Sequence, residues 1–155
     1  MRRYILTGHD RPTVTLHEGE DRHPGQGELA VDLRAASLNY RDLIVAKNVM
    51  DLVPLSDGAG IVHGLGAGVE GFAVGDRFVI GFMPGWVEGE FTEAKKATSL
   101  GGGGVGGVLA ERIVVPATGV AHIPEEMTFE EAATLPCAGV TAWSGVWCMD
   151  HDIVA

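Results

Sequence analysis

The chain has 155 residues, of which 46% are hydrophobic and 21% charged, and its formal net charge is −10. This length fits one globular domain with enough apolar side chains for a core. An acidic chain without a lysine- and arginine-rich run is not expected to bind nucleic acid. There is no membrane-length apolar run and no signal-peptide-like start, so we expect no membrane partner.

Cysteine and glycine usage add two expectations. Cys137 and Cys148 are too few for a disulfide framework, which favours reduced thiols in a cytoplasmic setting. The 23 glycines cluster in residues 58–71 and 101–107. Clustered glycines are typical of turns and close backbone approaches in a small barrel-like β domain.

Short strands are predicted through most of the chain. Residues 28–38 alternate clearly, with Leu29, Val31 and Leu33 on one face, as in a half-buried strand. Turn signals that contain glycine and proline separate this segment from its neighbours. The other predicted strands are residues 3–7, 13–17, 58–65, 77–82 and 109–115.

Helix signals are fewer. Asn39 is placed as the N-cap of a short helix over residues 40–47, with Asp42 at its third position. Thr128 and Glu131 form a capping-box pattern that opens a helix over residues 129–135. A further helix is predicted to begin near Ala138 and to run toward Met149.

Two glycine clusters have the spelling G-x-G-x-x-G, at residues 66–71 and 101–107. A dinucleotide phosphate site needs a strand before such a motif and a helix after it. Both clusters are followed by strand-like sequence instead. We therefore predict ordinary loops at both places.

Three motifs carry a family resemblance: Asn39-Tyr40-Arg41-Asp42, Asp57-Gly58-Ala59-Gly60, and the run from Leu135 to Trp143. With them the chain resembles the medium-chain dehydrogenase/reductase family, in particular its zinc-free, quinone-oxidoreductase-like branch. The resemblance implies a mainly β fold with short helices, a partly open GroES-like barrel over residues 1–136. Residues 137–155 would begin the linking helix toward a nucleotide-binding Rossmann domain, which this chain does not contain.

The resemblance also bears on metal binding. The zinc-ligand positions of the family fall on Asn39, Ser56 and Cys137, and a neighbouring glutamate falls on Asp57. A set with one thiol cannot form the usual three-ligand zinc site. Residues 82–109 contain no cysteine for a structural zinc. We therefore expect no metal; a zinc alcohol dehydrogenase with unusual ligands is the weaker alternative.

The polar run after residue 38 is the candidate catalytic site. Hydride transfer to a carbonyl needs a hydrogen-bond donor for the developing oxyanion and a proton source. Asn39 offers an amide donor, Tyr40 a phenol, and Asp42 can orient either of them. The alternative is purely local: a helix N-terminus in which Asn39 is the cap and Asp42 supports the turn.

The resemblance assigns cofactor contacts as well. It places Tyr40 near the pyrophosphate and Thr141 near the nicotinamide amide of NADP or NAD, and Arg41 is a third candidate because it offers a fixed cation. Thr141 has an alternative role as a helix hydroxyl bonded to a backbone carbonyl.

Three other residues have competing interpretations. Cys137 is either a reactive thiol near a helix start or a buried small hydrophobe. Trp86 either lines a substrate pocket or caps the core. Asp57 is expected to accept backbone N–H bonds within its own turn.

Taken together, the sequence predicts the catalytic part of an NAD(P)H-dependent, zinc-independent oxidoreductase that acts on a quinone, enone, aldehyde or alcohol. Whether the chain itself is an enzyme stays open, because the alternative is a non-catalytic, truncated β-barrel domain with a binding role. An apolar stripe on the last predicted helix favours a homo-oligomer through that helix. The stripe comprises Val140, Trp143, Val146 and Trp147.

Overall fold

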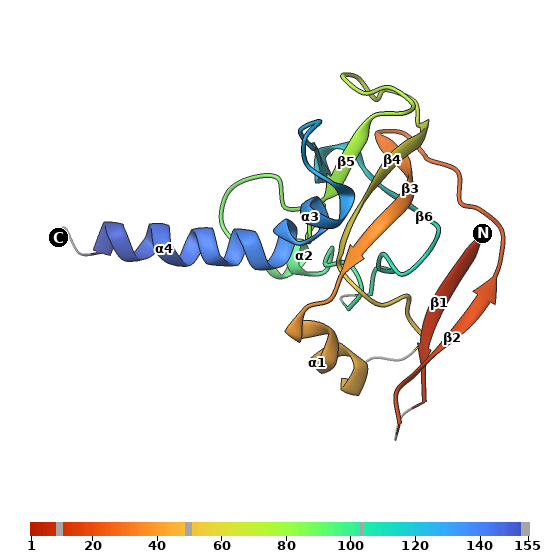
Figure 1. The fold of residues 1–155 in the computed structure, drawn as a ribbon, viewed down its shortest axis with the longest axis horizontal. Coiled ribbons are helices and arrows are strands. Elements are labelled where there is room, and N and C mark those ends of the chain that lie inside the picture. Colours follow the sequence, from red (N-terminus) through yellow and green to blue (C-terminus); the bar gives the residue numbers. More distant parts are fainter. Residues whose placement is uncertain (9–10, 49–50, 103, 153–155) are drawn as a thin grey trace.

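The computed structural model describes residues 1–8, 11–48, 51–102 and 104–152, with side chains to Val146 (Figure 1). Strands predominate, and the helices are short except for the last. The elements in chain order are β1 (Arg2–Thr7), β2 (Thr13–Glu18), β3 (Glu28–Ser37), α1 (Tyr40–Asn48), β4 (Asp57–Leu65), β5 (Arg77–Ile80), α2 (Glu93–Lys96), β6 (Arg112–Pro116), β7 (Val120–His122), α3 (Phe129–Ala133) and α4 (Val140–Asp152).

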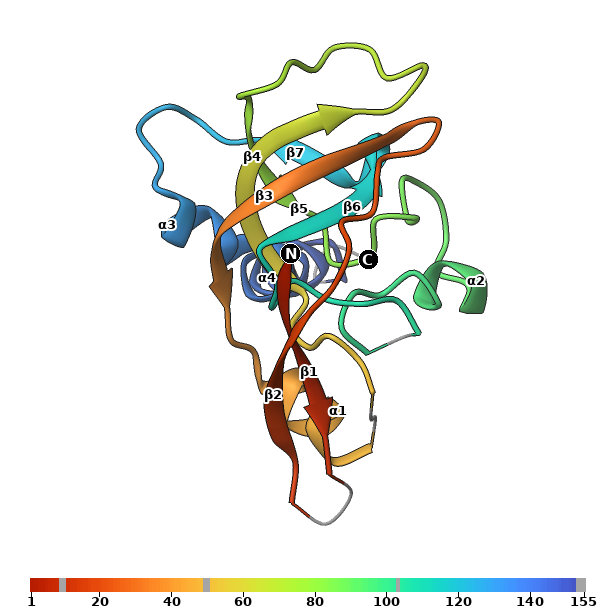
Figure 2. The same ribbon diagram turned by 90° about the vertical axis from the view of Figure 1, so that its right-hand side faces the viewer.

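The strands form one curved antiparallel sheet and one separate hairpin. The sheet has the strand order β6-β3-β4-β5-β7, and β1 pairs with β2 beside it (Figure 2). The sheet does not close on itself, so the expected partly open barrel is confirmed. The main core cluster packs on this sheet, and its largest fully buried side chains are Phe78, Leu29, Ile80, Leu100, Val31, Val62, Val108 and Val115.

Most local predictions are confirmed. The predicted strands are all present, and α1 begins at Tyr40 directly after Asn39. The capping box at α3 has both of its bonds: Glu131 N–H donates to Thr128 Oγ1 at 3.2 Å, and Thr128 N–H donates to Glu131 Oε2 at 2.9 Å. The sequence did not reveal α2 or the three-residue β7.

Two predicted boundaries were wrong for identifiable reasons. The strand expected from residue 109 begins only at Arg112, because the chain before it bonds to β1: Leu109 C=O accepts from Tyr4 N–H at 2.9 Å. The helix expected to reach residue 135 ends at Ala133. Pro136 has no N–H to donate, and the chain makes a wide π-helical turn, Leu135–Gly139, before α4 begins at Val140.

The first glycine cluster is the loop between β4 and β5, as predicted. Gly68 and Gly71 have φ of 74° and 78°, a backbone conformation that favours glycine. A side chain at Gly66 would collide with the carbonyl of Gly25, so the first glycine serves a close backbone approach. In the second cluster residue 103 lies outside the described residues. The next element after this cluster is a strand, β6, which begins at Arg112, and not a helix.

The last helices place the site. α3 packs on β3, β4 and β5, with Ala132 and Ala133 buried against Ala59 of β4. The π-helical turn also contacts β4, and α4 then projects away from the sheet (Figure 1). Within the described residues, every helix is too short or too polar to cross a membrane.

Candidate functional site

Three segments meet where β3 ends. Ser37 is the last residue of β3 and pairs with Asp57, the first residue of β4, and the π-helical turn lies against the start of β4. Polar side chains gather at this junction. We call them the polar cluster, and they are Asn39, Arg41, Asp42, Asp57 and Cys137.

Asp57 ties the junction together. It has no exposed surface; its Oδ1 accepts from Ser56 Oγ at 2.7 Å, and its Oδ2 accepts from the Cys137 backbone N–H at 2.8 Å. Asp57 was expected to accept a backbone N–H bond, and it does. The donor, however, belongs to a residue 80 positions further along the chain and not to the local turn. Asp57 thus fixes the π-helical turn on β4.

Asn39 and Asp42 hold the start of α1 and leave two polar atoms unused. Asp42 Oδ2 accepts from Asn39 N–H at 2.7 Å, which is the reciprocal half of a capping box. Asn39 Nδ2 and Asp42 Oδ1 are buried and have no hydrogen-bond partner within the described part of the chain. Because buried polar atoms nearly always have partners, this donor and acceptor indicate a place for a bound polar group.

Burial also changes the acidity of Asp42. Loss of solvent raises the pKa of its carboxyl, and the charge of Asp57 acts in the same direction. The bond from Asn39 N–H and the charge of Arg41 oppose the rise without cancelling it. Asp42 therefore carries its proton over a wider pH range than an exposed aspartate does.

Arg41 is anchored within the fold. Its Nη1 donates to the Leu100 carbonyl at 3.0 Å, and its Cζ lies 4.6 Å from the centre of the Phe82 ring. The other two predicted cofactor contacts lie on open surface: Tyr40 is 79% exposed at the start of α1, and Thr141 is exposed on α4. The structure does not bring them into the polar cluster, and their cofactor roles stay predictions.

Cys137 has the environment of a neutral thiol. Burial raises its pKa, the charges of Asp57 and Asp42 raise it further, and Arg41 opposes them. Cys137 is only half-buried, so it is not the buried side chain of one interpretation, and its raised pKa argues against the reactive thiolate of the other.

An apolar cavity of 430 Å³ adjoins the polar cluster. Phe82, which Arg41 covers, lines it, and so does Pro136, the chain neighbour of Cys137. Trp86 also lines it, as one of its two interpretations predicted. A volume of this size lies within the roughly 300–1,000 Å³ typical of small-molecule pockets. The remaining lining residues come from three separate segments, and no sequence signal marks them as pocket residues: Val79, Ile80, Gly81, Met83, Thr118, Gly119, Val120, Ala121, Leu135 and Val140.

The cluster does not fit a zinc ion of the alcohol dehydrogenase kind. Ser56 is fully buried and its hydroxyl already donates to Asp57, and an amide such as that of Asn39 is a poor zinc ligand. No group of three or more histidine, cysteine, aspartate or glutamate side chains in the described ranges could hold a metal.

Comparison with known proteins places the chain in a family. Residues 25–125 match the family described as "Alcohol dehydrogenase GroES-like domain". The chain therefore belongs to this family, as the N-terminal, GroES-like part of a medium-chain dehydrogenase/reductase.

Individual relatives support this family assignment. A fission yeast (Schizosaccharomyces pombe) protein named "Zinc-type alcohol dehydrogenase-like protein C1773.06c" is 46% identical over 134 residues, which cover 82% of this chain and 38% of the relative. A crystal structure of an alcohol dehydrogenase-type protein from Sinorhizobium meliloti 1021 is 32% identical, with a TM-score of 0.85, over 97% of this chain and 46% of that one. A second crystal structure, titled an NAD-dependent alcohol dehydrogenase, is 33% identical, with a TM-score of 0.76. The match covers 92% of this chain and 45% of that one. The chain thus spans less than half the length of these relatives.

Proposed function

We propose that the chain supplies the substrate-binding and catalytic part of an NAD(P)H-dependent oxidoreductase that works without zinc. The substrate class is a small apolar molecule with a polarised C=O group, a quinone, enone or aldehyde, or the corresponding alcohol in the reverse direction. Residues 1–136 form this part, and residues 137–155 begin the connection to a nucleotide-binding domain. One observation carries the proposal: the polar cluster holds a buried amide donor without a partner in the described residues, and Arg41 of the same cluster covers Phe82, which lines the apolar cavity.

Asn39 has the central role. Its Nδ2–H, which has no partner in the described residues, would donate to the carbonyl oxygen of a substrate whose apolar part occupies the cavity. Negative charge develops on that oxygen during reduction, and a fixed donor stabilises it more strongly than it stabilises the neutral carbonyl. Asp42 positions Asn39 through the bond to its backbone N–H.

Asp42 is also the candidate carrier for the proton that completes the product. Its raised pKa leaves a larger protonated fraction, and its Oδ1 has no partner within the described residues. A carboxyl group in that state can donate a proton to the reduced oxygen and recover it from solvent. Tyr40, the other catalytic candidate, is exposed, so its phenol would act only once another surface covers it.

A nicotinamide cofactor, NADP or NAD, would supply the hydride. Tyr40 at the start of α1 and Thr141 at the start of α4 are both exposed, and they fit a cofactor held mainly by another domain. Arg41 would contribute its charge from a fixed position between Leu100 and Phe82.

Binding of a carbonyl probe tests the proposal on the chain itself. Duroquinone is suitable because its fully methylated ring cannot alkylate cysteine, and calorimetry measures its affinity. Asn39→Ala should weaken binding about 3- to 10-fold, the equivalent of one hydrogen bond. Asn48→Ala is the matched control, since Asn48 lies at the far end of α1, where its Nδ2 donates to Ile44 C=O at 2.7 Å. Equal affinities of the two variants would remove Asn39 from the site.

A further inference from the structure

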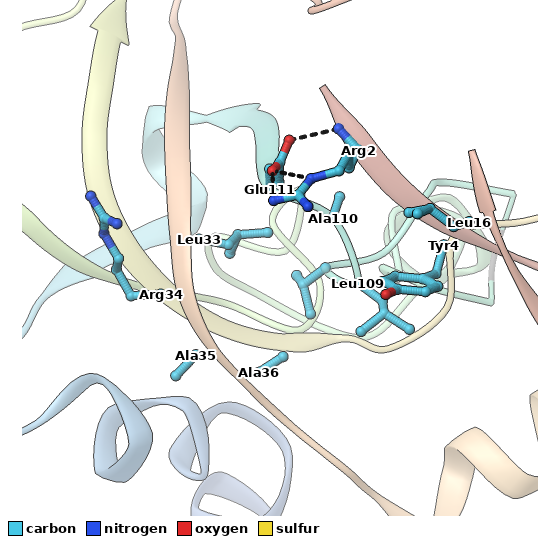
Figure 3. Close-up of a pocket in the computed structure, with 11 residues that line it drawn as sticks. Arg2, Tyr4, Leu16, Leu33, Arg34, Ala35, Ala36, Leu109, Ala110 and Glu111 are labelled. Carbon is cyan, nitrogen blue, oxygen red and sulfur yellow. Dashed lines mark hydrogen bonds and ion pairs between the residues drawn. The ribbon is translucent and has the colours of Figure 1, made fainter. Parts of the chain in front are cut away.

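Two consecutive arginines of β1 have different surroundings. Side chains alternate along a strand, so Arg2 and Arg3 lie on opposite faces of β1. Arg2 Nε donates to Glu111 at 2.6 Å, and this pair lies in the cleft that Figure 3 shows. Arg3 Nε, in contrast, is buried and has no hydrogen-bond partner within the described residues. The ion pairs of this part of the chain do not include Arg3 either.

A second cavity lies on the Arg3 side of the strand, and its volume is 210 Å³. We call it the arginine pocket, because three arginines are among the residues that line it: Met1, Arg3, Arg22, Val53, Val105, Gly106, Gly107, Ala110, Arg112, Ile113 and Val114. No aspartate or glutamate is among these lining residues, as far as the structure describes the chain. None of them belongs to the polar cluster or lines the apolar cavity beside it.

Two of the three arginines already have carboxylate partners. Arg22 Nη2 donates to both carboxylate oxygens of Glu28, at 2.6 and 2.8 Å. Arg112 Nε donates to Asp32 Oδ1 at 2.7 Å, and Arg112 Nη1 pairs with Asp21. Arg3 is therefore the arginine of this pocket whose positive charge has no carboxylate beside it in the described ranges.

A half-buried arginine with a desolvated, unbonded Nε is an uncommon arrangement. Buried polar atoms nearly always have partners, and buried charges are usually paired. The planar fork of a guanidinium matches the two oxygens of a carboxylate, and such charge-assisted pairs are among the stronger hydrogen bonds in proteins. Arg3 thus indicates a place for an anionic acceptor that this chain does not itself provide.

We propose that the arginine pocket binds a small monocarboxylate. Its head group pairs with the Arg3 guanidinium, and its short apolar part lies against the aliphatic side chains of the lining, which are Val53, Val105, Ile113 and Val114. The volume of 210 Å³ is below the roughly 300–1,000 Å³ of pockets for larger ligands, so the apolar part is one small ring or a short chain.

The charges favour a carboxylate over a phosphate group. One unpaired cation balances one negative charge, whereas a phosphate monoester carries about −1.5 to −2 near neutral pH. Arg22 and Arg112 are already engaged, and the aliphatic wall offers no donor for further oxygens. An uncharged ligand would leave Arg3 without a partner. The inference is independent of the function proposed for the polar cluster, because the two sites share no residue.

Binding of benzoate tests the proposal on the chain as it is. An NMR titration near neutral pH measures both the affinity and its location. We expect a Kd of about 0.1–1 mM, the range for a ligand of so few atoms, with changes at the Arg3 Nε–H signal and at the amides of Gly106, Gly107 and Ala110. Benzamide has the same ring without the charge and should bind about 10-fold more weakly or worse. Inorganic phosphate should also bind more weakly than benzoate.

Two neighbouring variants locate the charge. Arg3→Leu should weaken benzoate binding about 10-fold or more, because it removes the guanidinium. Arg2→Leu is the matched control: it loses the same charge from the same strand, but on the face that does not line the arginine pocket, and it should leave the affinity unchanged. Arg3 has no ion pair to lose, so Arg3→Leu should still fold, which circular dichroism checks.

Four results would overturn the proposal. They are equal binding of benzoate and benzamide, phosphate binding at least as tight as that of benzoate, equal affinities of the two variants, and no binding at 5 mM benzoate (roughly five times the weakest expected Kd). The comparison of the three ligands needs no variant, so it decides the question even if Arg3→Leu does not fold.

Discussion

Replacement of Asp57 is the most demanding test of the junction that builds the site. Asp57→Ala removes a fully buried carboxylate and leaves the Ser56 hydroxyl and the Cys137 N–H without their acceptor. Hydrogen bonds to a charged acceptor contribute about 1.5–3 kcal/mol each. Removal of a buried charge offsets part of that loss. We therefore expect the free energy of unfolding to fall by about 3 kcal/mol.

Thermal and urea unfolding measure this loss. For a chain of this length, about 3 kcal/mol corresponds to a fall in Tm of roughly 6–12 °C. Ser56→Ala in the Asp57→Ala background removes one of the two orphaned groups and should restore about 1 kcal/mol. Exposed Glu126→Ala is the control for loss of one acidic side chain and should stay within about 0.5 kcal/mol of the parent. A loss below 1 kcal/mol for Asp57→Ala, an order-of-magnitude threshold for one hydrogen bond, would show that Asp57 does not hold the turn.

The remaining predictions concern metal, cofactor, thiol and association. The purified chain should contain no zinc after dialysis, because Ser56 and Asn39 do not suit the ion; near-stoichiometric zinc by elemental analysis would contradict this. The chain alone should bind NAD(P)H weakly, since Tyr40 and Thr141 offer few contacts, and micromolar affinity in a fluorescence titration would be inconsistent with that account. In a Cys148→Ser background, the pH midpoint for alkylation of Cys137 should lie above the free-cysteine pKa of about 8.5, because burial favours the thiol; a midpoint at or below that value would contradict this. The exposed apolar residues of α4 should promote self-association, so Trp143→Ser with Val146→Ser should shift sedimentation toward monomer unless the parent is already monomeric at high concentration.

Local signals in the sequence were enough for most elements. The strand β3 and the Thr128 capping box depend on neighbouring residues alone, and both are present. The predicted alternation of β3 was wrong over its first half, because Leu29, Ala30 and Val31 are all buried and the register is irregular between Ala30 and Val31. The first glycine cluster was correctly separated from a phosphate loop because the motif needs a following helix. The misplaced end of α3 has a local cause too, the missing N–H of Pro136, although its consequence is a π-helical turn that no periodicity predicts.

The site was predictable only in part. Asn39 and Asp42 lie three positions apart, the spacing of an N-cap and its supporting acid, so their pairing followed from the sequence. The Asp57 contact with Cys137 joins residues 80 positions apart, and only the folded chain reveals it. The cavity draws on three separate segments, and Trp86 is the one lining residue for which the sequence had suggested a pocket role. The arginine pocket was also invisible to sequence patterns, because its arginines stand at positions 3, 22 and 112 and only the fold brings them together.

The most direct test of the catalytic proposal is turnover in a complete enzyme. This chain can replace the matching 134-residue region of the fission yeast relative, to which it is 46% identical, and the fusion can be assayed for duroquinone reduction by NADPH and NADH in EDTA. The account predicts turnover that EDTA leaves intact and that Asn39→Ala lowers about 100- to 1,000-fold in kcat/KM, the effect of removing one oxyanion donor. Asn48→Ala should leave the rate unchanged. Loss of activity in EDTA, or an Asn39→Ala rate equal to that of Asn48→Ala, would contradict the account.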